Sequence, residues 1–417
     1  MYRRWRLPGS GVASCPWGLI LAAWASCAFA PLAAAAQQGP ARQTVDSTPQ
    51  QDLMDLFARV LHGKPKLGDT IPIPPKMILT VLPSFSANPT VGFQLGVSGN
   101  AVTRLGSDEE TSLSTVSASV SYTTKKQFNI LLRSNVFTSG NVWKLEGDWR
   151  YLDTNQPTYG LGPAFPEEFK SEMDFNLLRF YETVYHEVIP DVLFGVGYHF
   201  NHYFTIIDHS PDPATSAFGR YYGGQPVSKS TASGASLNLL SDTRDNPINS
   251  KRGYYARASY RIFPTWLGSD DAWQSLETEF RAYPRIPLPG NGILAVWGLT
   301  WFSFGRPPYL ELPAIGWDYN NRTGRGYAQG RIRAEDLIYG EAEYRVTLTR
   351  NGMWGAAAFF NLTSASDEAG TLQSPNPGGG VGLRLKLNKH SDTNIAIDVG
   401  FGSEGSHGVF FGTGEAF

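Results

Sequence analysis

The chain has 417 residues, of which 41% are hydrophobic, 13% aromatic and only 17% charged, and its mean hydropathy is −0.24. The low charged fraction and the 44 glycines exclude a long disordered or coiled-coil protein. The negative mean hydropathy excludes a bundle of membrane-spanning helices. A net charge of −2 without a long basic run argues against a nucleic-acid-binding protein, because such proteins present a positively charged surface.

The amino terminus has the three parts of a secretory signal peptide. Arg3, Arg4 and Arg6 precede an apolar stretch, which ends in the alanine run 33–36. We therefore predict that residues 1–36 are a signal peptide, a reading favoured over an uncleaved anchor helix. Both cysteines of the chain lie inside this segment, so the exported chain would contain no disulfide and no thiolate metal site.

Residues 37–76 form a predicted periplasmic leader that contains one amphipathic helix. Thr48 can cap this helix, Pro49 suits its first position, and five apolar side chains between 53 and 61 share one face. The predicted helix covers about 49–62. It could dock on the periplasmic mouth, plug the lumen or contact a partner, and a peripheral helix without a specific role is an equal alternative.

From residue 77 to the end, apolar and polar residues alternate with period two. In 141–153, for example, the apolar side chains of Trp143, Leu145 and Trp149 alternate with charged ones. This alternation predicts sixteen strands: 77–86, 90–104, 111–124, 126–137, 141–153, 173–188, 191–206, 229–243, 253–263, 272–283, 292–304, 335–348, 353–363, 378–387, 393–402 and 407–417. Segment 173–188 alternates poorly, so its register is not predicted.

Segment lengths and loop lengths favour a membrane barrel over a soluble sandwich. The segments are mostly ten to fourteen residues long, near the ~9–11 residues that a tilted strand needs to cross a bilayer. The long connections, 154–172, 207–228, 305–334 and 364–377, all follow odd-numbered segments and therefore share one side. We predict an all-β fold, a 16-stranded antiparallel transmembrane barrel over 77–417, in the outer membrane of a Gram-negative bacterium with both termini in the periplasm.

The last segment is predicted to run to the end of the chain. Counting by two from Val409 places Phe411 and Phe417 on the apolar, lipid-facing side. A terminal aromatic residue on the last strand resembles the recognition signal of outer-membrane barrels, which makes Phe417 the candidate signal. Glu415 stands where many porins have an aromatic residue.

Three stretches resemble the BamA/TamA family of barrel assembly and translocation proteins, the bacterial surface antigen superfamily. Asp242, Arg244 and Asp245, followed by Gly253, are similar to a strand-turn-strand signature of that family. Arg325-Gly326-Tyr327, in the longest predicted outer loop, resembles the Arg-Gly-aromatic motif of the sixth extracellular loop, which in the family folds back into the lumen. The stretches 340–345, 359–361 and 411–417 fit the last strands in order.

The resemblance implies that the loop arginine meets acidic groups on two neighbouring strands. Counting by two from Ile338 turns Glu341, Glu343 and Arg345 into the lumen, and the same counting turns Asn361 inward. We hypothesise that Arg325 pairs with Glu343, because buried charges must be matched. The family's second acid is usually an aspartate, and Asn361 takes its place here.

Classical members of the family carry periplasmic polypeptide-transport modules, and residues 37–76 are too short for one. The sequence therefore resembles a module-less branch. Two functions remain open: insertion or translocation of outer-membrane proteins or lipids, and a passive pore or structural barrel that lacks this activity. Expected partners are outer-membrane lipids and lipopolysaccharide, with client barrel proteins or a periplasmic partner as further candidates.

No enzyme motif stands out, and no cofactor or metal site is expected. His199 and His202 lie three residues apart, which places them on opposite faces of a strand and makes a metal-binding pair improbable. Gly378-Gly379-Gly380 is interpreted as room for a strand to bend.

Overall fold

The computed structural model describes residues 50–53, 55–56, 77–107, 111–284, 286, 289–389 and 391–417. All of these belong to one compact unit, Thr48–Phe417. The predicted signal peptide, 1–36, and most of the predicted leader lie outside the described residues. Among the described residues, no helix is both long and apolar enough to cross a membrane.

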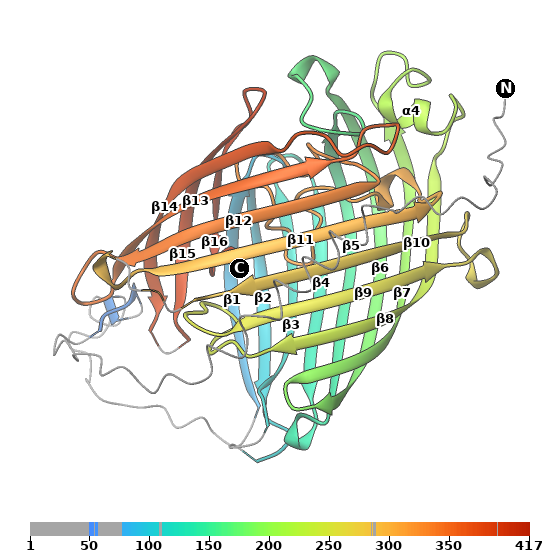
Figure 1. Ribbon diagram of the computed structural model, residues 1–417. Helices are drawn as coiled ribbons and strands as arrows, with labels where there is room; N and C mark the ends of the chain where they lie inside the picture. The colour runs from blue at the N-terminus through green and yellow to red at the C-terminus, as the bar shows by residue number, and fades with distance from the viewer. Residues whose placement is uncertain are drawn as a thin grey trace, which may run out of the picture. The chain divides into compact units, whose positions relative to one another are not determined.

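Sixteen antiparallel strands form a closed barrel in which each strand pairs with its neighbours in sequence and β1 pairs with β16 (Figure 1). The bounds are β1 Ile78–Asn88, β2 Gly92–Thr103, β3 Ser114–Thr123, β4 Phe128–Phe137, β5 Trp143–Thr158, β6 Ser171–Ile189, β7 Val192–Asp208, β8 Lys229–Asp242, β9 Tyr254–Phe263, β10 Trp273–Ala282, β11 Ile293–Gly305, β12 Asp336–Thr347, β13 Trp354–Ala365, β14 Asn376–Asn388, β15 Thr393–Gly402 and β16 His407–Thr413. The short helix α4, Ala217–Tyr221, lies in the connection between β7 and β8. The predicted fold class is confirmed.

The distribution of side chains is inverted relative to a soluble protein. Along β12 the inward positions Glu341, Glu343 and Arg345 are buried, whereas Ala342 on the outward side is exposed. The same holds elsewhere: Leu237, Val381 and many other large apolar side chains face outward and are exposed. Charged groups inside and apolar groups outside are what a barrel needs when its outer surface meets hydrocarbon.

The predicted strands agree with the observed ones apart from their ends. The register between β5 and β6 runs from Trp143 opposite His186 to Thr158 opposite Ser171, so β5 extends five residues beyond its predicted end. The pairing of β6 with β7 contains two register shifts, between Asp174 and Asn176 and between Glu187 and Ile189. Burial nevertheless alternates along β6, and the sequence pattern is blurred because the inward residues Met173, Phe175 and Leu177 are apolar and pack in a core with residues 309, 310 and 312 of the connection between β11 and β12.

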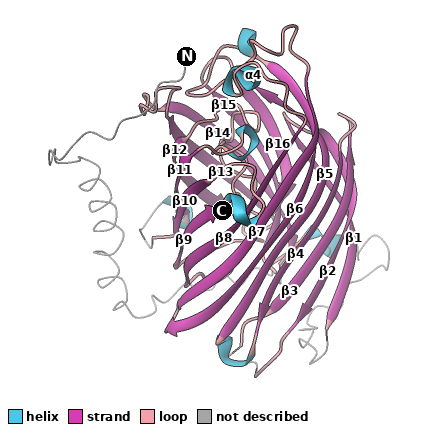
Figure 2. Ribbon diagram, turned by 90° about the vertical axis from the view of Figure 1, so that its right-hand side faces the viewer, coloured by secondary structure: helices cyan, strands magenta, loops and turns pink. Residues whose placement is uncertain are grey.

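The prediction that the last strand reaches residue 417 is wrong. β16 ends at Thr413, and Gly414 adopts a φ of +82°, a left-handed conformation that glycine tolerates. The chain turns there into the lumen, so Phe417 is 5% exposed and lies against Trp297 of β11, with ring centroids 5.2 Å apart. The carboxyl terminus lies within the outline of the barrel in both views (Figures 1 and 2). Phe417 therefore does not share the lipid-facing side with Phe411.

The described part of the leader contacts the barrel at two neighbouring turns. Leu53 and Leu56 have helical backbone, and the rest of the predicted helix 49–62, apart from a few residues, lies outside the described residues. The Asp52 carboxylate accepts a hydrogen bond from the backbone N–H of Lys389 at 2.9 Å, in the turn between β14 and β15. The backbone N–H of Gln51 donates to the carbonyl of Asn351, between β12 and β13. The start of the predicted helix is thus held at the end of the barrel where these turns lie.

Candidate functional site

The connection between β11 and β12, residues 306–335, crosses the lumen and contacts opposite walls of the barrel. On one wall the Tyr319 carbonyl accepts hydrogen bonds from Arg133 of β4 at 2.8 Å and from Arg150 of β5 at 3.2 Å. The Tyr319 ring lies between Arg133 and Arg257 of β9, at 5.0 and 5.3 Å. On the other wall Arg325 contacts β12, β13 and β15. We call residues 306–335 the lumenal loop.

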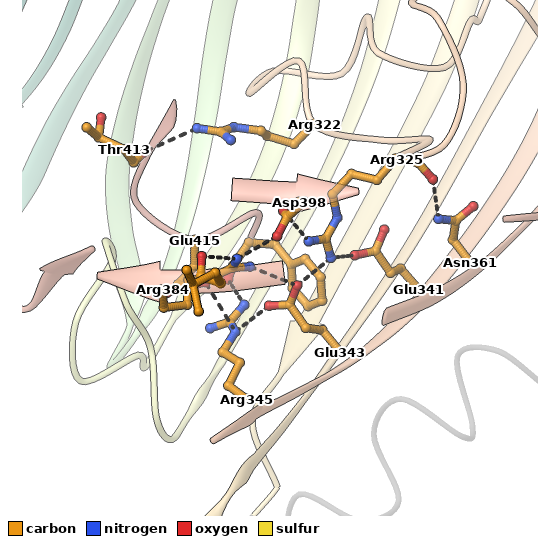
Figure 3. Close-up of polar contacts among 12 residues, drawn as sticks. Arg322, Arg325, Glu341, Glu343, Arg345, Asn361, Arg384, Asp398, Thr413 and Glu415 are labelled. Atoms are coloured by element: carbon orange, nitrogen blue, oxygen red, sulfur yellow. Dashed lines mark hydrogen bonds and ion pairs between the residues drawn. The ribbon is translucent and has the colours of Figure 1, made fainter. Parts of the chain in front are cut away.

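Arg325 lies among three carboxylates that come from two strands (Figure 3). Its guanidinium forms ion pairs with Glu341, with Glu343 at 2.5 Å and with Asp398 of β15 at 2.9 Å. All four side chains are at least nine-tenths buried. A buried cation of this kind is tolerated because each desolvated charge meets an opposite one. We call this group the arginine anchor.

The strands between β12 and β15 leave room for the guanidinium. Phe359 of β13 presents its ring face to Arg325, with the guanidinium carbon 3.7 Å from the ring centroid, a cation–π contact. On β14 the facing positions are glycines: a Cβ on Gly380 would lie 2.7 Å from the Phe359 ring. Because these positions carry no bulky side chain, Arg325 reaches β15 across two intervening strands.

The backbone after Arg325 packs directly on the barrel wall. Gly326 has a φ of +109°, and a Cβ there would lie 2.6 Å from the carbonyl oxygen of Phe401. On the wall itself, a Cβ on Gly400 would lie 2.7 Å from the backbone nitrogen of Gly326. Glycine is therefore required on both sides of this contact, for conformation in the loop and for close approach on β15.

Tyr327, the aromatic residue of the motif, fits between β14 and β15. It is 2% exposed, and its hydroxyl donates to the Pro377 carbonyl at 2.5 Å and lies 2.9 Å from the Ser403 hydroxyl. A Cβ on Gly402 would lie 2.5 Å from the tyrosine ring, and one on Gly378 would lie 3.1 Å from it. The glycine run of β14 thus accommodates this ring, in addition to any part it has in bending the strand.

A second layer of charges connects the arginine anchor to the carboxyl-terminal residues (Figure 3). Arg384 of β14 pairs with Asp398 at 2.5 Å and with Glu415 at 2.7 Å. Arg345 of β12 pairs with Glu343 at 2.5 Å and donates to the Phe417 carbonyl at 2.8 Å. The inward turn after β16 therefore places the last residues in the same network as the lumenal loop.

Further contacts hold the rest of the lumenal loop. Arg322 donates to the Thr413 carbonyl at 3.1 Å, at the end of β16. Arg331 pairs with Glu167 of the connection between β5 and β6 at 2.6 Å, and its guanidinium lies 3.9 Å from the Tyr159 ring centroid. Burial opposes ionisation of Glu167, but the hydrogen bond and charge of Arg331 outweigh it, so the pKa of Glu167 is lowered.

The structure brings most of the sequence-predicted site residues together. Arg325 and Glu343 lie in contact, as the hypothesis requires, and Glu341 adds a second carboxylate. The side-chain amide of Asn361 donates to the Arg325 carbonyl at 3.0 Å, so Asn361 holds the loop backbone and not the guanidinium. The anchor therefore contains three carboxylates, and Asn361 is not among the groups that pair with the guanidinium.

The predicted strand-turn signature lies apart from the anchor, in the connection between β8 and β9. Arg244 donates to the Asp242 carboxylate at 2.7 and 2.8 Å, and the Asp245 carboxylate accepts from the backbone N–H of Lys251 and Arg252. Gly253 has a φ of +87°, and a Cβ there would clash with the Thr243 carbonyl. These contacts shape the turn itself.

The same connection contacts a turn on the far side of the barrel. Lys251 pairs with Asp392 at 2.6 Å, and Asn246 and Asn249 donate to the carbonyls of Ser391 and Asp392. The β8–β9 connection therefore bridges to the β14–β15 turn, at the end of the barrel where the leader is held.

Sequence reasoning missed Asp398, Arg384 and Gly400 as parts of the site. Alternation along β14 and β15 puts Arg384 and Asp398 on the polar, inward side of their strands, but it carries no information on which inward charges meet. His199 is buried, with Nε2 2.8 Å from the Ser236 hydroxyl, whereas His202 points to the other face toward Thr231. In the described part of the chain no group of histidine, cysteine and acidic side chains has the arrangement of a metal site.

Comparison with known proteins identifies this barrel type by its fold. No protein-family model matches the sequence, and no curated protein is similar to it in sequence. Among solved structures, BamA from Haemophilus ducreyi lacking POTRA domains 1-3 superposes with a TM-score of 0.55 at 12% identity, over 81% of this chain and 70% of that one. CdiB from Escherichia coli superposes with a TM-score of 0.50 at 11% identity, over 82% and 63%. The chain thus has a BamA-like 16-stranded barrel fold and spans about two thirds of the length of these neighbours.

Proposed function

We propose that this protein is an outer-membrane barrel that takes part in the insertion or translocation of outer-membrane proteins or lipids. The observation that carries the proposal is the arginine anchor: a loop residue, Arg325, is buried in the lumen and forms ion pairs with Glu341, Glu343 and Asp398. The outward-facing apolar surface supports the membrane location. The proposed orientation places both termini and the leader in the periplasm.

The lumenal loop argues against the alternative of a passive pore. It touches β4, β5 and β9 on one wall and β12, β13 and β15 on the other, through Tyr319 and Arg325. A loop held on both walls narrows the lumen through which ions would have to pass. A barrel that passes client chains or lipids sideways, between two of its strands, keeps its lumen closed while it does so. The membrane therefore stays sealed.

The wall has one weakly paired seam. In the part of the chain that the structure describes, β1 and β16 are paired at a single position, Ala87 opposite Phe411. By contrast β1 pairs with β2 along its whole length, from Ile78 to Asn88. A stacked contact between Phe85 and Phe411, 5.6 Å between centroids, adds to the seam. Few backbone hydrogen bonds make this the least costly place for the barrel to open toward lipid, and a client strand could add there.

The proposed partners are outer-membrane lipids, lipopolysaccharide and client barrel proteins, with a periplasmic partner at the leader. The test combines depletion and conductance. Depletion of the protein should lower the amount of other barrel proteins in the outer membrane, and the purified barrel should show little steady conductance in planar bilayers. Unchanged barrel proteins together with robust ohmic channels would reject the proposal in favour of the passive pore.

A crosslink tests the seam directly. Cysteines in place of Ala87 and Phe411 should lock β1 to β16 under oxidising conditions, and the locked protein should fail to restore barrel-protein levels until a reductant is added. The matched control places cysteines at Ser98 and Ser119, a register pair of β2 and β3. Loss of activity in both locked proteins, or in neither, would contradict opening at the seam.

A further inference from the structure

A small cavity lies between the lumenal loop and the barrel wall, and no residue of the arginine anchor lines it. Strands β5 to β11 form the wall side, and residues of the lumenal loop, among them Glu311 and Tyr319, form the other side. The cavity has a volume of about 50 Å³. At the ~10–15 Å³ that one water molecule needs, this is room for about four waters. The cavity is therefore small, and it is complete only when the loop is in place.

Arg179 of β6 brings a buried positive charge to this cavity. It is 9% exposed, its Nε donates to the side-chain oxygen of Asn201 at 3.0 Å, and its guanidinium carbon lies 4.6 Å from the Tyr181 ring centroid. Among the residues that the structure describes, no carboxylate forms an ion pair with Arg179, and its two terminal nitrogens donate no hydrogen bond. A desolvated guanidinium with unused donors binds anions strongly, because charge-assisted hydrogen bonds are roughly twice as strong as neutral ones.

The carboxylates that line the cavity are already matched by other cations. Three of them meet five cations in ion pairs of 2.5 to 3.8 Å: Glu277 with Arg257 and Arg261, Asp148 with Arg150 and Arg133, and Glu146 with Lys144. The fourth, Glu311, accepts a hydrogen bond from the Asn201 amide at 2.6 Å. Together with Arg179, the described groups around the cavity comprise six cations and four carboxylates. Buried charges need opposite ones, so this excess favours a bound anion.

Hydrogen-bond donors without a partner lie around the same cavity. The hydroxyls of Ser259 and Tyr319 are buried and have no hydrogen-bond partner in the described part of the chain. The same holds for Nε of Arg261 and Nδ1 of His199, whose side chains approach the Tyr181 ring to 6.0 and 4.3 Å. All four groups can donate a hydrogen bond. A ligand with several oxygen atoms would supply acceptors for them, whereas a cation or an apolar molecule would not.

We infer that this cavity binds one tetrahedral oxyanion, phosphate or sulfate, through Arg179, Arg261 and His199. The four oxygens of such an ion fit a space for about four waters. A lipid headgroup or a peptide carboxylate carries an attached chain, for which this volume has no room. Because Glu311 and Tyr319 belong to the lumenal loop, the bound ion holds the loop to the wall on the side away from the arginine anchor. The inference does not rest on insertion or translocation activity.

Equilibrium dialysis of the purified barrel against radiolabelled phosphate or sulfate, in a sodium chloride buffer, tests the inference. The wild-type protein should bind one ion per chain in a saturable manner. Arg179→Gln should weaken this binding at least tenfold, because hydrogen bonds between charged groups are lost in a buried site. Arg179→Lys keeps the charge but not the forked geometry, so it should be intermediate, and it serves as the second variant should Arg179→Gln fail to fold. Arg252→Gln, the same change of charge at an exposed turn outside the cavity, should bind like the wild type.

Trypsin cleavage of the lumenal loop gives the second readout. At one hundred times the dissociation constant, mass action predicts about hundredfold slower cleavage at Arg322 and Arg331 in the wild type. Arg179→Gln should lose this protection, and chloride or acetate at the same ionic strength should give none. No saturable binding, or equal binding by Arg179→Gln and Arg252→Gln, would overturn the inference. So would equal protection by chloride, which would be an effect of ionic strength alone, and binding without protection, which would place the ion elsewhere.

Discussion

Replacement of Arg325 by alanine tests the arginine anchor most directly. The substitution removes the cation shared by three buried carboxylates. Glu343 and Asp398 would still have Arg345 and Arg384, at 2.5 Å each, whereas Glu341 would retain only its hydrogen bond from Tyr339 among the groups that the structure describes. Arg325→Ala therefore leaves one buried carboxylate without a cation.

The expected loss of stability depends on how many of the three carboxylates keep a cation. Breaking a buried ion pair costs about 3–5 kcal/mol because the remaining charge stays desolvated. Since two of the three acids keep an arginine, we expect the lower end, about 3 kcal/mol. At ~1.4 kcal/mol per decade this is roughly a hundredfold rise in the population with the lumenal loop released. Arg325→Lys keeps the charge but not the forked geometry, so we expect an intermediate effect.

Limited proteolysis with trypsin measures loop release, because the lumenal loop contains Arg322, Arg331 and Arg333 as further cleavage sites. The folded wild-type protein should resist cleavage at these residues, and Arg325→Ala should be cut there much faster while heat-modifiable gel mobility shows an intact barrel. Arg252→Ala, an exposed turn residue with one long ion pair, is the control. If Arg325→Ala were as resistant as the wild type, the anchor would not hold the loop.

Three further predictions follow from the same region. Gly400→Ala should destabilise the folded barrel by about 1–3 kcal/mol in urea unfolding, because its methyl group would meet the Gly326 backbone. The control Gly340→Ala, with no atom within 4 Å of its Cβ, should have little effect on stability. Equal losses of stability in the two variants would argue against the close approach of loop and wall. Phe417→Ala should lower the free energy of unfolding by about 3 kcal/mol, because packing on Trp297 is lost. Phe401→Ala, on the lipid-facing side, should lower it less when the protein is in detergent. The reverse order would place Phe417 outside the lumen. Because the pKa of Glu167 is lowered by Arg331, the contact between residue 167 and the lumenal loop should be complete above the ordinary glutamate pKa of ~4.3 and lost as the pH falls through the lowered value. Hydrogen-exchange protection of 154–172, taken relative to the intrinsic exchange rate at each pH, should follow that curve in the wild type and stay constant in Glu167→Gln.

Much of the barrel follows from local sequence. A strand exposes alternate side chains to opposite faces, so a period-two pattern indicates both the strand and its inward residues without any knowledge of its neighbours. For this reason the count along β12 placed Glu341, Glu343 and Arg345 inside, where they are found. It failed at β16, because nothing in the alternation distinguishes Gly414 as the point where the chain leaves the sheet.

The pairing inside the lumen depends on the relative positions of distant strands. Arg325 meets Asp398 across β13 and β14, which requires the register of three strand pairs and small residues such as Gly380 on the way. The family resemblance suggested Glu343 as a partner, but the replacement of the second acid by Asn361 gave no hint that β15 would supply one. Closing of the sheet determines which inward charges face one another.

The sequence by itself determined that there are sixteen strands, which side chains face inward on most of them, and that the long loops share one side, because alternation and turn length act over a few residues. Only the tertiary structure decided that the lumenal loop is held by three carboxylates, that β15 presents glycines where the loop backbone approaches, and that the chain ends inside the barrel. These features join residues far apart in the sequence, up to the 417 − 297 = 120 positions between Phe417 and Trp297. Such contacts depend on barrel closure and strand register, which local patterns do not encode.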